Sequence, residues 1–218
     1  MLTTNRVLWI LFWAIIIGLS LYFYVETFLA YFGGFVPENF KKGFLESKIW
    51  FIGHIAGASA SLLLGPLQFW NRIRTRYMKY HRVAGKIFIV GSLIAAVCAF
   101  RINLMYDCKP CRISLGILST IWLFSTAAAW WAIKNKNIKG HRQFMVRSYT
   151  AALAFVFIRI FALIGYQKIF PFLDNLSDRR VTAEWLCWVL PFIIIETYMV
   201  LWPSLKARKP SGSSLTPR

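Results

Sequence analysis

The chain has 218 residues, of which 58% are hydrophobic and only 16% are charged, and its mean hydropathy is +0.54. Soluble domains are about 45 to 50% apolar, so this composition excludes an ordinary soluble enzyme and predicts an integral membrane protein. The net charge of +18 does not indicate a nucleic-acid partner, because Lys and Arg are concentrated between long apolar runs. The expected partners are membrane lipids, above all an anionic inner leaflet.

Six apolar segments are long enough to cross a bilayer, since a helical span needs about 20 residues. We expect spans at 7–24, 49–70, 83–106, 113–133, 144–166 and 183–202, within one membrane domain over residues 1–203. No small-residue cleavage site closes the first segment, so we interpret it as an uncleaved span and not as a secretory signal. Residues 204–218 are basic and rich in Ser, Pro and Gly, which predicts a disordered cytoplasmic tail. The predicted fold class is all-α, a bundle of six transmembrane helices.

The connections between these spans differ in charge. Most Lys and Arg residues lie before span one, in the turns after spans two and four, and in the tail, whereas most acidic residues lie in or beside the other three turns. Basic loops stay on the cytoplasmic side of a membrane. Both termini are therefore predicted to be cytoplasmic, and the chain to be a multi-pass protein of the plasma membrane, the inner membrane of a bacterium.

Span two carries two patterns at helical spacing. Small residues recur every fourth position, at Gly53, Gly57, Ser61 and Gly65. They leave one edge of the helix almost without side chains, so a neighbouring backbone can approach closely. A polar stripe also follows one face of the helix, through His54, Ser61, Gly65 and Gln68.

Two of the three histidines open apolar segments at the same predicted depth. His81 begins span three, His141 begins span five, and each is followed by Arg. Two imidazoles on neighbouring helices are the ligand set of a b-type haem iron, so haem b is one predicted cofactor. Alternatively, each His-Arg pair anchors its helix among the lipid headgroups.

The remaining histidine, His54, lies inside span two on the polar stripe. An ionisable residue within a span is a functional candidate, although a hydrogen bond to a neighbouring helix would also account for it. Arg101 and Arg159 lie near the same membrane boundary. Together with His54, and with Gln68 further along the stripe, they predict a cofactor pocket for a quinone carbonyl, a haem propionate or a lipid phosphate. The alternative is that both arginines extend outward to water or headgroups.

Two further pairs carry charge or sulfur. Glu196 lies within span six after Pro191, and its expected partner is Arg147 or a histidine. The pair is predicted to be either a proton relay or an ion pair that fixes helix register. Cys108 and Cys111 form a C-x-x-C in an outer turn, where a structural disulfide is expected more often than a redox catalyst.

Several of these residues also carry a resemblance to a known family. They are His54, the segment LGPLQF at 64–69, Arg74, HRVAGK at 81–86, HRQFMVRSY at 141–149, and Arg159. Over residues 50 to 165 the chain resembles an uncharacterised bacterial family of predicted multi-span membrane proteins, a domain of unknown function with paired HR motifs. The resemblance implies a helical membrane protein and no assigned activity, and it does not include the C-x-x-C.

The function expected from these patterns is that of a small membrane redox or cofactor-binding protein with haem b or a quinone. Its candidate ligands are His54, His81 and His141. A transporter or lipid-handling protein with a polar path along span two is the alternative, and a non-catalytic scaffold is a third. No P-loop, G-x-G-x-x-G, H-E-x-x-H or G-x-S-x-G motif occurs in the sequence, so no catalytic residue is assigned.

Overall fold

The computed structural model describes residues 4–32, 41–106 and 108–206, with side chains for 7–27, 47–106 and 108–206. Helices make up its regular structure, and no strand occurs in these residues. Six of the helices are long and apolar enough to cross a membrane, which confirms the predicted all-α fold class with six spans. The elements are α1 (Thr4–Phe32), α2 (Lys41–Phe69), α3 (Asn71–Arg76), α4 (Met78–Asn103), α5 (Lys109–Lys134), α6 (Ile138–Ile164), α7 (Tyr166–Ile169), α8 (Leu176–Glu196), the π-helical turn η2 (Thr197–Leu201) and α9 (Trp202–Lys206).

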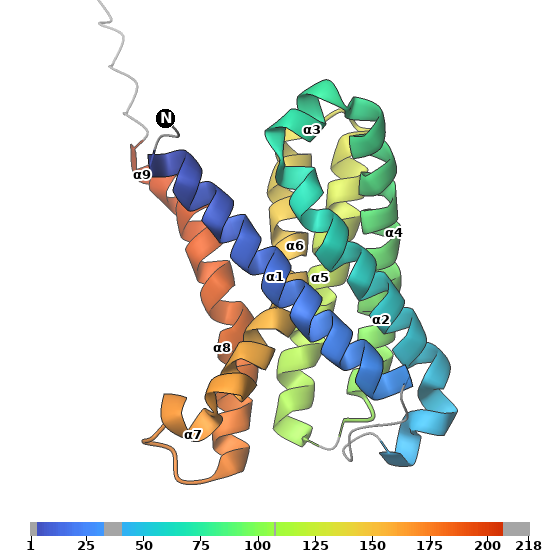
Figure 1. Cartoon of the computed structure of the whole chain (residues 1–218), viewed down its shortest axis with the longest axis vertical. Helices are drawn as coiled ribbons and strands as arrows, with labels where there is room; N and C mark the ends of the chain where they lie inside the picture. Colours follow the sequence, from blue (N-terminus) through green and yellow to red (C-terminus); the bar gives the residue numbers. More distant parts are fainter. Residues whose placement is uncertain (1–3, 33–40, 107, 207–218) are drawn as a thin grey trace, which may run out of the picture.

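The core of the molecule is a four-helix bundle. Its helices α2, α4, α5 and α6 contact one another in that order, and α6 returns to α2. Helix α1 crosses the bundle over α2 and α6, and α8 stands at the left-hand edge of the view against α6 and α5 (Figure 1). The start of α1 lies at the same end as α3 and α9, whereas α7 lies at the opposite end (Figure 1). An even number of spans requires this arrangement, and the side of the membrane that each end faces stays a prediction.

The small residues of α2 explain how closely α2 and α4 pack. A methyl group at Gly57 would overlap the backbone oxygen of Gly91, so neither helix can carry a larger side chain there. Beside this contact Ser61 Oγ lies 2.7 Å from Ser92 Oγ and also donates to the Gly57 oxygen at 3.0 Å. Gly65 belongs to a different contact, because its missing side chain makes room for the ring of Tyr149 on α6.

The helix bounds differ from the predicted apolar spans by several residues at most ends. The third span is Met78–Asn103 and not 83–106, so His81 lies inside α4. Helix α5 begins at Lys109, where the Cys108 side chain accepts from the Cys111 amide and Pro110 stands in the first turn. Helix α6 ends before Gly165, whose φ of 95° is left-handed.

The sixth span runs over Leu176–Lys206 through α8, η2 and α9. Residues 204–206, which the sequence assigns to the tail, are helical and belong to α9. The rest of that prediction, residues 207–218, lies outside the described residues.

Candidate functional site

A cavity of about 450 Å³ lies in the half of the bundle nearer α7, which is the size of a small-molecule site. We call it the α7-side cavity. Helices α1, α2, α4, α5, α6, α7 and α8 all contribute to its wall. Its aromatic residues include Phe51, Trp122 and Phe155, and its polar ones include Thr27, His54, Asn103, Tyr106, Arg159, Arg180 and Glu184.

His54 presents an unpaired nitrogen to this cavity. Its Nδ1 lies 3.0 Å from the backbone oxygen of Ala95 on α4. A carbonyl oxygen can only accept a hydrogen bond, so we assign the proton to Nδ1, which leaves a lone pair on Nε2 of the neutral ring. Nε2 has no hydrogen-bond partner among the described residues, and the imidazole stands perpendicular to the Trp122 ring at 6.4 Å. This nitrogen is available to a ligand.

Two more buried groups on the wall lack partners within the described part of the chain. They are Nε1 of Trp122, a donor, and Oδ1 of Asn103, an acceptor. The Asn103 amide is oriented by its own Nδ2, which donates to the Arg112 oxygen at 2.7 Å. A buried polar group without a partner costs about 1–3 kcal/mol, so a ligand or water that satisfied both groups would be stabilised in this cavity.

The charged groups of the cavity lie nearer its α7 end. Arg159 stacks on Phe155 with 5.4 Å between guanidinium and ring, and its Nη2 lies 3.5 Å from Thr27 Oγ1 on α1. Glu184 is only 7% exposed and accepts a hydrogen bond from the Tyr106 hydroxyl at 3.3 Å. Burial and the neighbouring Glu184 charge raise the pKa of Tyr106 to about 12, so this phenol keeps its proton at neutral pH.

The structure brings together only part of the predicted pocket. His54 and Arg159 both line the α7-side cavity, whereas Arg101 is exposed and Gln68 lies toward the other end of α2.

Sequence reasoning missed Glu184, because the sixth span was expected to start at 183. Helix α8 begins at Leu176, so Glu184 lies two turns inside it. An acidic residue within a span is a functional candidate, so knowing that α8 starts at Leu176 would have identified Glu184.

A second polar group of residues lies at the α3 end of the bundle, and we call it the α3-end cluster: Gln68, His81, His141 and Tyr149. His141 Nδ1 lies 3.0 Å from the Ala129 oxygen, and His81 is within electrostatic range of His141. Gln68 Nε2, His81 Nδ1 and the Tyr149 hydroxyl are buried and have no partner among the described residues.

The α3-end cluster fits a bis-imidazole iron site in part. Helices α4 and α6 lie across the diagonal of the four-helix bundle, and His81 of α4 is within electrostatic range of His141 of α6. The Ala129 carbonyl would fix the tautomer of His141 and leave its Nε2 for a metal, whereas His81 lacks such a bond. No group of three or more His, Cys, Asp or Glu residues occurs in the described ranges, so a metal held there would rely on these two imidazoles.

The other predicted residues make contacts within and between helices. The stripe on α2 is not an open path, because Ser61 is bonded to Ser92 and the Tyr149 ring covers Gly65. Arg147 pairs with Glu196 through two bonds of 2.5 and 2.7 Å, which joins α6 to α8. Cys108 and Cys111 form a disulfide at the start of α5.

Comparison with known proteins places residues 51–199 in one family. They match the sequence model of the family described as predicted membrane protein (DUF2306). This match covers more than half of the chain and extends past the predicted limit of 165 into η2. No curated protein and no solved structure gave a significant match.

Proposed function

The chain belongs to the DUF2306 family of predicted membrane proteins, and on this premise we propose that it binds the ring of a quinone or quinol in the α7-side cavity. The observation that carries the proposal is the set of unpaired polar groups on an otherwise largely apolar wall. His54 Nε2 and Asn103 Oδ1 are acceptors, and Trp122 Nε1 is a donor. All three belong to one cavity.

This mixture suits a ring that both accepts and donates hydrogen bonds. A quinone carbonyl accepts from Trp122 Nε1 or from the Arg159 guanidinium, and a quinol hydroxyl donates to His54 or Asn103. The aromatic side chains pack on the ring faces. A purely anionic ligand is less well matched, because Glu184 places a carboxyl group beside Arg180 on the same wall.

Tryptophan fluorescence tests the proposal in purified full-length protein. We expect a short-chain quinone to quench emission saturably, with Trp122 supplying a large part of the signal because it lines the cavity. Trp122→Phe removes that part of the quenching, whereas Trp131→Phe, on the same helix but 68% exposed, leaves it in place. Quenching that grows linearly with quinone and is equal in all three proteins contradicts the proposal.

A second candidate cofactor, haem b, is supported by the position of His81 and His141 across the bundle diagonal. When bound, haem supplies one-electron chemistry. Optical spectra of protein made with ample haem should show a stoichiometric Soret band that is lost in His81→Ala and in His141→Ala. His54→Ala, in the other half of the bundle, should keep the band. A colourless wild-type protein contradicts haem binding and leaves the quinone proposal untouched.

A further inference from the structure

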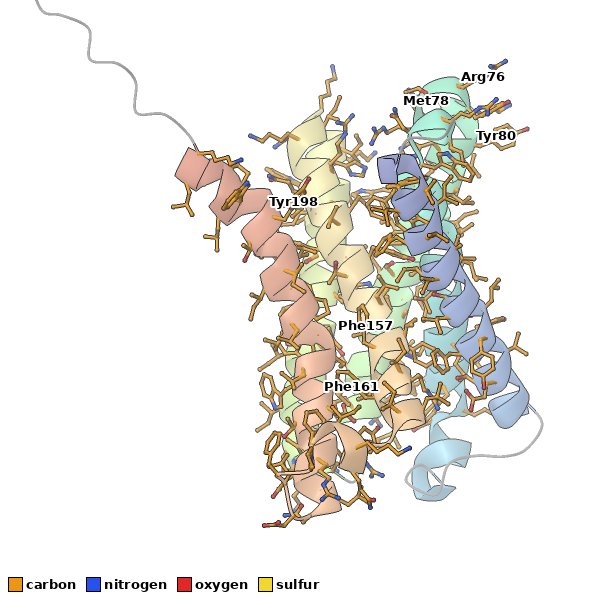
Figure 2. All side chains as sticks on the ribbon, turned by 60° about the vertical axis from the view of Figure 1, so that its left-hand side comes forward. Arg76, Met78, Tyr80, Phe157, Phe161 and Tyr198 are labelled. Atoms are coloured by element: carbon orange, nitrogen blue, oxygen red, sulfur yellow. A yellow bond between two sulfur atoms is a disulfide. The ribbon has the colours of Figure 1, made fainter. Side chains whose placement is uncertain are left out.

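A second cavity lies on the side of α6 that faces away from the bundle, and we call it the apolar groove. It has a volume of about 510 Å³, with α6 as its floor and α1 and α8 as its sides. Residues typical of its wall are Trp13, Ile16, Leu153, Phe157, Leu190 and Ile194. Figure 2 shows Phe157 and Phe161 pointing from α6 toward α8.

The apolar groove adjoins the α7-side cavity. Cys187 of α8 lines both of them, and it packs against Ala154 of α6. The wall between the two spaces therefore consists of small side chains at this point. On α8 the polar residues Arg180 and Glu184 precede Cys187 and line the cavity, whereas Leu190 and Ile194 follow it and line the groove.

Along α8, polar residues are followed by apolar ones, which matches the polar head and apolar tail of an amphiphile that lies along the bilayer normal. The floor of the groove on α6, residues 146–161, is about 22 Å long, and Ala154, which packs against Cys187, lies near its middle. Water is a poor occupant, since an apolar cavity offers it few hydrogen bonds. An apolar chain fits this space, and the polar cavity adjoins it beside Cys187.

We infer that the ligand is a quinone with a long isoprenoid or alkyl tail, whose ring occupies the α7-side cavity and whose tail lies in the apolar groove. This inference rests on the proposed function, because the ring site decides where the tail begins. Ligand entry is then lateral, from the bilayer between α1 and α8, and it requires the contact between Ala154 and Cys187 to open.

The test compares two quinones with the same ring, one with a ten-carbon tail and one without, in protein embedded in lipid nanodiscs. The variant Leu190→Trp fills the apolar groove. Ile193→Trp is the matched control, because Ile193 lies on the same helix with similar exposure, 56% against 46%, and lines neither space. Affinities are compared between proteins for one ligand at a time, so partition of the tail into lipid cancels.

Leu190→Trp should weaken binding of the tailed quinone roughly ten-fold and leave the tailless quinone unchanged, and Ile193→Trp should alter neither. If both quinones bind Leu190→Trp as they bind the wild type, the tail lies elsewhere and the inference is overturned, while the ring site stands. If neither quinone binds the wild type, the proposed function itself fails and this inference falls with it.

Discussion

Replacing His54 by Leu is expected to weaken quinone binding about 10- to 100-fold. His54 Nε2 is one of two acceptors that the described structure leaves free in the α7-side cavity, and Asn103 Oδ1 is the other. The variant loses a hydrogen bond made away from water and leaves a polar group of the ligand without a partner, which together cost about 1.5–3 kcal/mol of binding free energy. Each 1.4 kcal/mol lowers the affinity about ten-fold. Leucine removes the bond and keeps most of the volume, so the cavity does not collapse.

The measurement is an equilibrium titration of one short-chain quinone against wild type, His54→Leu and His81→Leu. His81 lies in the α3-end cluster, so His81→Leu controls for loss of an imidazole as such. Because His54 also bonds the Ala95 oxygen, the thermal midpoint of each variant is recorded. Equal affinity in all three folded proteins would show that the ring does not contact His54.

Hydropathy and small-residue spacing predicted the spans and part of their packing. The reason is that both depend on residues close together in one helix. The spacing of Gly57 and Ser61 indicated a close helix neighbour, and α4 fills that role. Helix depth likewise suggested Arg147 as the partner of Glu196, since both lie at similar distances from the same end of the bundle.

The α7-side cavity could not be predicted in the same way, because its wall is assembled from seven helices. Asn103 ends α4 and Trp122 lies in the middle of α5, and their separation in sequence gives no sign that both face His54. Tyr106 lies beyond the end of α4, where hydropathy placed it inside a span. Which residues share a cavity depends on helix rotation and crossing, and these are set by contacts far apart in the chain.

The ion pair between Arg147 and Glu196 is expected to give the largest effect on stability. Its side chains are 18% and 35% exposed, and it lies inside the spans of α6 and α8. Breaking this half-buried pair inside the spans leaves one charge without compensation, at a cost of about 3 kcal/mol, similar to that of an arginine within a bilayer. We expect Glu196→Gln to lower the free energy of unfolding by about this amount.

The two halves of the pair should not be equivalent. Removing Arg147 as Arg147→Met leaves a carboxyl group that can take up a proton and become neutral, whereas Glu196→Gln leaves a guanidinium that cannot lose its charge. Arg147→Met should therefore cost less than Glu196→Gln, and the double variant less than the sum of the two. Denaturant unfolding of all four proteins in the same detergent measures this coupling. Equal and additive losses would mean that the contact does not act as an ion pair. A coupling of about 2 kcal/mol or more would show that the ion pair, together with the apolar contacts around Ala154 and Cys187, holds α8 against α6.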